Sequence, residues 1–87
     1  MLRITTENIG DEGRIFFLEG KVCHEWVKEL HTEIMKGMNE GKKVILDFSK
    51  VRFIDEEGAR MLQSLPQGKV EKKNLSLFLR EILKREA

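Results

Sequence analysis

The first apolar segments of the chain have the composition of short strands. Residues 2–6 are LRITT and residues 14–19 are RIFFLE, both with β-branched or aromatic side chains. Between them lies NIGDEG, whose glycines and acidic residues favour a turn. This pattern predicts a β-hairpin near the N-terminus.

From Cys23 onward, the apolar residues recur every three or four positions. The recurring positions are Cys23, Trp26, Val27, Leu30, Ile34 and Met38, and mostly charged residues fill the positions between them. That period is typical of an amphipathic helix that turns one face toward a core. Gly37 and Gly41 then favour the end of the helix.

The next apolar run predicts the central strand of a sheet. Residues 42–48, KKVILDF, are apolar apart from two lysines and Asp47, as in a strand that a parallel sheet buries on both faces. The segment 49–54, SKVRFI, follows this strand. A short helix is expected from about Glu56, with apolar residues facing the sheet until Pro66 ends it.

The C-terminal part predicts one weak strand and one helix. Residues 69–74, KVEKKN, are almost all polar, so a strand here would be an edge strand protected by its lysines. Ser76 is a favourable N-cap for a final helix. That helix is expected to bury Phe78, Leu79, Ile82 and Leu83.

The elements are therefore predicted in the order ββαβαβα. This order fits an α/β fold in which helices cover a mixed β-sheet. A chain of 87 residues is too short for two hydrophobic cores, so we expect a single domain over residues 1–87.

Charge and cysteine content narrow the range of partners. The 16 Lys and Arg residues nearly balance the 15 Asp and Glu residues, so no net field attracts nucleic acid or an anionic membrane. The sequence has neither a bilayer-spanning apolar run nor the apolar core of a secretory signal. One cysteine and two histidines make neither an internal disulfide nor a structural zinc site. We expect a cytoplasmic protein without nucleic-acid partner, membrane insertion, metal or cofactor.

An acidic junction joins the apolar segment to the following helix. Asp55 is placed to act as the N-cap, and Glu56 and Glu57 then fall in the first turn, where the helix dipole is positive. Each first-turn carboxylate stabilises a helix by about 0.3–1 kcal/mol, and this alone can explain the acidic residues. The junction also follows the C-terminal end of a central strand, where open α/β sheets bind ligands. Gly58, which weakens the helix, indicates that another group comes close to the backbone.

Three stretches together resemble the STAS domain, the fold of bacterial anti-sigma factor antagonists and of the cytoplasmic tails of sulfate transporters. They are IFFLEGKV at 15–22, VILDFSKVRFIDEEGARML at 44–62 and NLSLFLREILK at 74–84. At their centre, Asp47-Phe48-Ser49 and Phe53-Ile54-Asp55-x-x-Gly58 are similar to the D-L-S and hydrophobic-D-S-S-G signature of the family. The resemblance implies a STAS-like fold and a non-enzymatic module that binds a protein, either an anti-sigma factor or a kinase-like regulator.

In the antagonists that this chain resembles, the serine before the signature glycine is phosphorylated by the partner kinase. Glu57 stands at that position here, and Glu56 stands at the position before it. Because glutamate has no hydroxyl group, the usual switch cannot operate at this site. Either Glu57 imitates phosphoserine with a charge of about −1 in place of about −1.5 to −2, or the domain binds its partner constitutively. We slightly favour constitutive binding, because a mimic that cannot be reset is a poor switch.

The candidate partner-binding residues surround this junction. They are Ser49, Arg52, Asp55, Glu56, Glu57, Gly58 and Arg60, of which the two arginines flank the carboxylates and are expected to neutralise them. His24 and His31 are interpreted as residues of a solvated helix surface.

Other functions remain open at this point. The chain could be a STAS domain that binds a nucleotide or another small molecule, or an accessory domain of a transporter, and two chains could pair through the N-terminal hairpin. An enzyme has no support, since the sequence shows no nucleophile with its base and no pair of carboxylates with a defined role.

Overall fold

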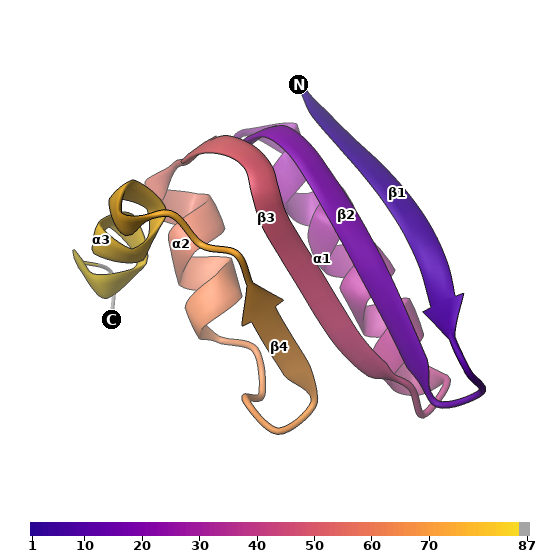
Figure 1. The fold of residues 1–87 in the computed structure, drawn as a ribbon. Coiled ribbons are helices and arrows are strands. Elements are labelled where there is room, and N and C mark those ends of the chain that lie inside the picture. Colours follow the sequence, from indigo (N-terminus) through magenta and orange to yellow (C-terminus); the bar gives the residue numbers. More distant parts are fainter. Residues whose placement is uncertain (86–87) are drawn as a thin grey trace.

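The computed structural model describes residues 1–85 and confirms the predicted order of elements. The elements are β1 (Leu2–Ile9), β2 (Gly13–Val22), α1 (Glu25–Asn39), β3 (Lys43–Ile54), α2 (Glu56–Gln63), β4 (Val70–Lys73) and α3 (Leu77–Arg85). Figure 1 shows the strands as one curved sheet, with α1 and α2 behind it and α3 beside α2.

The sheet is mixed and its strands follow one another in the order β1-β2-β3-β4. β1 and β2 form the predicted antiparallel hairpin, whereas β2 pairs with β3 and β3 with β4 in parallel. The C-terminal ends of β2 and β3 therefore lie side by side, and α1 and α2 both start near this end of the sheet (Figure 1). β4 lies at the edge, as its lysines predicted.

The core lies between one face of the sheet and the helices. Its largest fully buried side chains come from β2, β3 and all three helices: Phe16, Phe48, Leu18, Leu30, Ile34, Leu46, Ile54, Leu62, Leu79, Val22 and Val44. The prediction that the central strand is buried on both faces was wrong, because Ile45 and Asp47 are only half-buried and Phe17 is exposed beside them. The apolar run overstated burial because α1 and α2 cover the same face (Figure 1).

Two predicted boundaries differ from the observed ones. The segment 49–54 is not separate from the central strand but continues β3 to Ile54, and two shifts in register keep it paired with β2. Helix α1 begins at Glu25 instead of Cys23, since His24 has a φ of 54° and lies outside the helical region. Local irregularities of this kind leave no trace in the apolar pattern.

Helix α3 confirms the predicted cap but not the whole predicted apolar face. The Leu79 N–H donates to Ser76 Oγ at 3.1 Å, so Ser76 caps the helix as expected. Leu79 and Leu83 are buried, whereas Phe78 is 56% exposed. Phe78 precedes Leu79 by one residue, about 100° around the helix, and so points away from the sheet.

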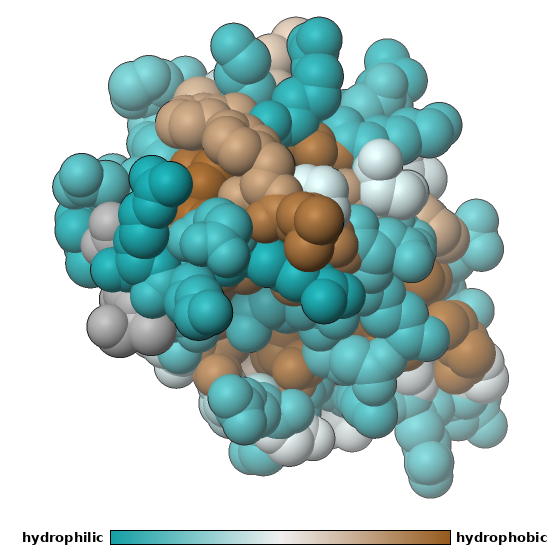
Figure 2. Space-filling model, turned by 60° about the vertical axis from the view of Figure 1, so that its left-hand side comes forward, coloured by the Kyte–Doolittle hydropathy of each residue, from teal (hydrophilic) through white to brown (hydrophobic). Residues whose placement is uncertain are grey.

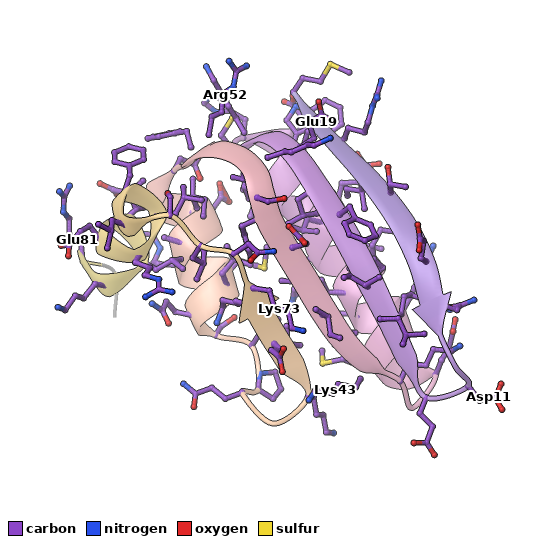
Figure 3. All side chains as sticks on the ribbon, in the orientation of Figure 1. Asp11, Glu19, Lys43, Arg52, Lys73 and Glu81 are labelled. Atoms are coloured by element: carbon purple, nitrogen blue, oxygen red, sulfur yellow. The ribbon has the colours of Figure 1, made fainter. Side chains whose placement is uncertain are left out.

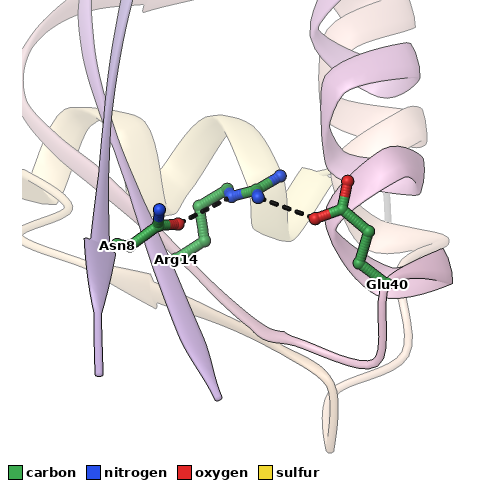
Figure 4. Close-up of polar contacts among 3 residues, drawn as sticks. All are labelled: Asn8, Arg14 and Glu40. Carbon is green, nitrogen blue, oxygen red and sulfur yellow. Dashed lines mark hydrogen bonds and ion pairs between the residues drawn. The ribbon is translucent and has the colours of Figure 1, made fainter. Parts of the chain in front are cut away.

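An ion pair ties the hairpin to the end of α1 at the opposite end of the sheet. Arg14 Nη2 lies 2.7 Å from Glu40 Oε1, and Arg14 Nε donates to Asn8 Oδ1 at 3.2 Å (Figure 4). These contacts fix the end of the molecule that lies away from the start of α2.

Candidate functional site

Asp55 connects the starts of two helices. It is the N-cap of α2, and its Oδ1 accepts a hydrogen bond from the Gly58 N–H at 2.7 Å, which confirms the predicted cap. Its Oδ2 accepts from the His24 N–H at 3.1 Å, just before α1. One carboxylate therefore satisfies two free backbone donors, one in its own helix and one from His24, 31 residues before Asp55 in the sequence. This double role fixes the start of α2 relative to α1.

Gly58 allows the backbone of α2 to approach β2. A Cβ at this position would lie 2.8 Å from the Val22 carbonyl oxygen and 3.1 Å from Ile54 Cγ2. The sequence indicated that a group approaches this glycine, and the structure identifies that group as the end of β2 in the same chain. Asp55 and Gly58 thus hold the junction together from inside.

Glu56 and Glu57 both point outward, but they border different grooves. Glu56 lines a groove of about 320 Å³ between the end of β3 and α3, together with Phe53, Ile82 and Arg85. Glu57 instead lines a groove between α1 and α2. The other residues of that second groove, which has a volume of about 440 Å³, are Val27, Lys28, His31, Arg60 and Met61.

The two flanking arginines behave differently. Arg60 Nη1 lies 3.8 Å from Glu56 Oε2 one turn earlier, a solvent-exposed pair of modest strength. Arg52 points away from the sheet in Figure 3 and forms no ion pair with any other residue of the range 1–85. The expectation that both arginines neutralise the junction therefore holds for Arg60 only.

Ser49 lies apart from the junction, on the open face of the sheet. It precedes Asp55 by six residues of strand, about 20 Å at the usual rise of a β-strand. Its N–H donates to Asp47 Oδ1 at 2.8 Å, and Asn74 Nδ2 donates to Asp47 Oδ2 at 3.0 Å. These bonds, that of the Ser49 N–H above all, hold the pKa of Asp47 below its ordinary value, although partial burial opposes them.

An exposed aromatic pair beside the junction was missed by sequence reasoning. Phe53, 40% exposed, and Phe78, 56% exposed, have ring centroids 6.5 Å apart. Leu77, which precedes Phe78 in the sequence, is 81% exposed. Figure 2 shows apolar side chains among hydrophilic ones on the surface of the molecule. The signal available in the sequence was the pair Phe53 and Ile54, because neighbouring residues of a strand face opposite sides and only one of them can enter the core.

The described residues hold neither a cluster for a metal ion nor a transmembrane helix. Within residues 1–85, no three His, Cys, Asp or Glu side chains are grouped so that they could bind a metal. In the same range, no helix is both long enough and apolar enough to cross a bilayer. His24 and His31 are exposed, and Cys23 is buried.

Comparisons with known proteins agree with this geometry. The unphosphorylated anti-sigma factor antagonist SpoIIAA superposes with a TM-score of 0.75 and 17% identity, over 94% of this chain and 82% of that one. The phosphorylated Bacillus cell fate determinant SpoIIAA gives a TM-score of 0.69 and 17% identity, over 98% of this chain and 84% of that one. At these identities, the likeness shows a shared fold.

A larger protein contains a region of the same shape. The crystal structure of Mglu superposes with a TM-score of 0.69 and 18% identity over 84% of this chain, which corresponds to 20% of Mglu. No match is found among the curated proteins. The sequence model of the STAS domain, however, matches residues 3–85. This chain therefore belongs to the STAS domain family.

Proposed function

We propose that this STAS domain is a non-enzymatic module that binds a protein through the surface at the start of α2. We call this the α2 surface and define it by Phe53, Glu56, Glu57, Arg60 and Phe78. Asp55 and Gly58 support it from inside, and Arg52 extends it at the end of β3. The partner is an anti-sigma factor or a kinase-like regulator, as the fold shared with SpoIIAA suggests. We place the encounter in the cytoplasm, a reducing compartment that the single cysteine fits.

The observation that carries this proposal is the exposed aromatic pair next to outward-facing charges. Phe53 and Phe78 leave apolar area in water, although the residue after each of them, Ile54 or Leu79, is buried in the core. Protein interfaces are enriched in aromatic residues at their centre and have a polar rim. Glu56, Glu57 and Arg60 supply such a rim on one side of the pair.

Glu57 implies that phosphorylation at this position does not regulate the proposed complex. The side chain presents a carboxylate and has no hydroxyl group for a serine kinase to phosphorylate. It lines the groove that also contains Lys28, His31 and Arg60, so a partner meets a fixed arrangement of charges there. We therefore propose constitutive binding.

The α2 surface is a poor phosphate site, which disfavours the nucleotide-binding alternative. Phosphates bind helix N-termini through free N–H groups and nearby cations. Here Asp55 already accepts the Gly58 N–H, and Glu56 adds another negative charge beside the groove with Phe53. A nucleotide would have to displace or approach these carboxylates. Titration with ATP and GTP, monitored by Trp26 fluorescence, is expected to give no saturable response.

The test is capture of the partner by wild-type and variant chains. The wild type is immobilised, retained proteins are cross-linked and identified, and the affinity of the purified partner is then measured by calorimetry. Phe53→Ser is expected to weaken binding at least about tenfold, since an aromatic side chain at the centre of an interface commonly contributes more than 1 kcal/mol. Glu57→Ser is expected to keep the partner but to lose it on incubation with ATP if that partner is a kinase.

The matched control is Phe17→Ser. Phe17 is 37% exposed, close to the 40% of Phe53, but it lies on the open face of the sheet, among the residues that line another pocket with Thr5 and Asp47. This substitution is expected to leave the affinity unchanged. If neither the wild type nor Glu57→Ser retains a protein, or if both serine substitutions of phenylalanine weaken binding equally, the proposal is wrong.

A further inference from the structure

The outer edge of β1 is long and regular, and its only charged side chains are Arg3 and Glu7. β1 pairs with β2 without a break from Leu2, opposite Gly20, to Ile9, opposite Gly13, so it contains no bulge. Its sequence, LRITTENI, contains neither proline nor lysine. Natural proteins usually protect an exposed edge with one of these features, because free N–H and C=O groups there can pair with another chain.

The opposite edge shows the protection that β1 lacks. β4 has only four residues, and its second half consists of Lys72 and Lys73. Glu71 accepts ion pairs from Lys43 and Lys73, each at 3.5 Å, so charged side chains crowd this edge. Among the described residues, only the edge of β1 is both long enough and open enough to add a strand.

The backbone of β1 determines which groups face outward. The Lys21 N–H donates to the Met1 carbonyl at 3.0 Å, so the polar groups of Met1 face β2. In an antiparallel pair these directions alternate, and the free N–H and C=O groups at the outer edge therefore belong to the even-numbered residues, from Leu2 to Asn8. An antiparallel partner strand must bond to these residues.

The side chains of the odd-numbered residues lie on the open face of the sheet. Thr5 is opposite Phe17 and is followed on the same face by Glu7, while Arg3 precedes it there. Neither Arg3 nor Glu7 forms an ion pair with the other residues of the range 1–85. The two charges stand at equal distances from Thr5 along the strand, with opposite sign.

We propose that the occupant of this edge is a second copy of the chain, paired antiparallel through β1 about a two-fold axis at Thr5. In this register the even-numbered residues bond to one another, and Arg3 of each copy lies opposite Glu7 of the other. The pair thus has two interchain ion pairs, and the sheet continues from one copy into the other. A shift of the register by two residues would place Arg3 opposite Ile9 and lose both ion pairs.

The test uses charge exchange between the two positions. Arg3→Glu gives a chain with two glutamates at these positions, and Glu7→Arg gives one with two arginines. Each variant places like charges opposite each other in its own dimer, so its dissociation constant is expected to be about tenfold or more weaker than that of the wild type. Analytical ultracentrifugation over a concentration series measures this constant.

Mixing the two variants is the decisive arm of the test. In an equimolar mixture, every glutamate of one chain faces an arginine of the other, so dimers are expected to form again. Arg3 also lies opposite Glu19 within its own sheet, and thermal unfolding of each variant therefore checks that the fold is intact. A change of monomer stability cannot produce recovery on mixing.

The other outcomes would overturn the proposal. A wild type that stays monomeric up to about 1 mM excludes a meaningful dimer, since this corresponds to only about 4 kcal/mol of association. Single variants that associate as well as the wild type would place the interface elsewhere, and a mixture that stays monomeric would exclude this register. The α2 surface lies at the other side of the sheet (Figure 1), so the proposed protein partner can be tested independently with Phe53→Ser.

Discussion

Within one helical turn, Asp55 and Gly58 contact the backbone of other segments, whereas Glu56 and Glu57 between them are exposed to solvent. Asp55 accepts hydrogen bonds from two backbone N–H groups, and Gly58 touches the backbone of β2. The two glutamates line separate grooves. In this chain, Asp55 and Gly58 therefore hold the backbone in place, whereas Glu56 and Glu57 are available to other molecules.

The largest loss of stability is expected from removing the Asp55 carboxylate, which accepts two hydrogen bonds. Asp55→Ala is predicted to lower the free energy of unfolding by about 2 kcal/mol, because it removes the cap of α2 and leaves the His24 N–H without its acceptor. Asp55→Asn should cost about half as much, since one amide oxygen replaces two acceptors. Urea unfolding measures both. Equal stability of all three proteins would contradict the bridging role of Asp55.

A slightly smaller effect is expected at the close approach of α2 and β2. Gly58→Ala should destabilise the protein by about 1–2 kcal/mol, because the new methyl group would crowd the Val22 carbonyl oxygen by more than alanine gains in helix propensity. Gly68→Ala is the matched control, since a Cβ there meets nothing within 4 Å. Thermal unfolding of the two variants should differ clearly, and equal melting temperatures would refute the argument.

The exposed carboxylates of Glu56 and Glu57 should contribute little to stability. Glu56→Gln and Glu57→Gln are each predicted to cost about 0.3–1 kcal/mol at low salt, through the loss of a first-turn charge. Glu56→Gln should cost slightly more, because it also removes the ion pair with Arg60. Both losses should shrink in 1 M salt, where charges are screened. A loss of stability as large as that of Asp55→Ala would show that Glu56 and Glu57 are also needed to hold the fold together.

The smallest loss of stability is expected on substitution of Asp47, and this loss should depend on pH. The pKa of Asp47 is lower in the folded protein, so Asp47 contributes stability above the unfolded pKa of about 3.9 and loses it as the pH falls through the folded value. Asp47→Asn should therefore cost less than about 1 kcal/mol at neutral pH, given its contact with solvent. The difference from the wild type should shrink between about pH 4 and pH 2 in urea unfolding. A constant difference over this range would argue against the hydrogen bonds of the Asp47 carboxylate.

Some features of the site could be predicted from the sequence, and others could not. The cap at Asp55 was predictable, since a capping side chain bonds to a backbone N–H only three residues later. The sequence predicted that some group lies close to Gly58, but it did not indicate that this group is the Val22 carbonyl oxygen of β2. The exposure of Phe78 was predicted wrongly, because the position of α3 on the molecule decides which of its apolar residues reach the core.

The amino-acid sequence alone indicates the order of the elements, the N-cap of α2 at Asp55 and the absence of a hydroxyl group at Glu57. These features depend on the residue types and on interactions within one turn of the chain. Three other features become visible only in the folded chain: Glu56 and Glu57 border different grooves, Phe53 meets Phe78, and the edge of β1 stays open. Each of these depends on segments far apart in the sequence, whose relative placement is set by packing around a shared core and not by local preference.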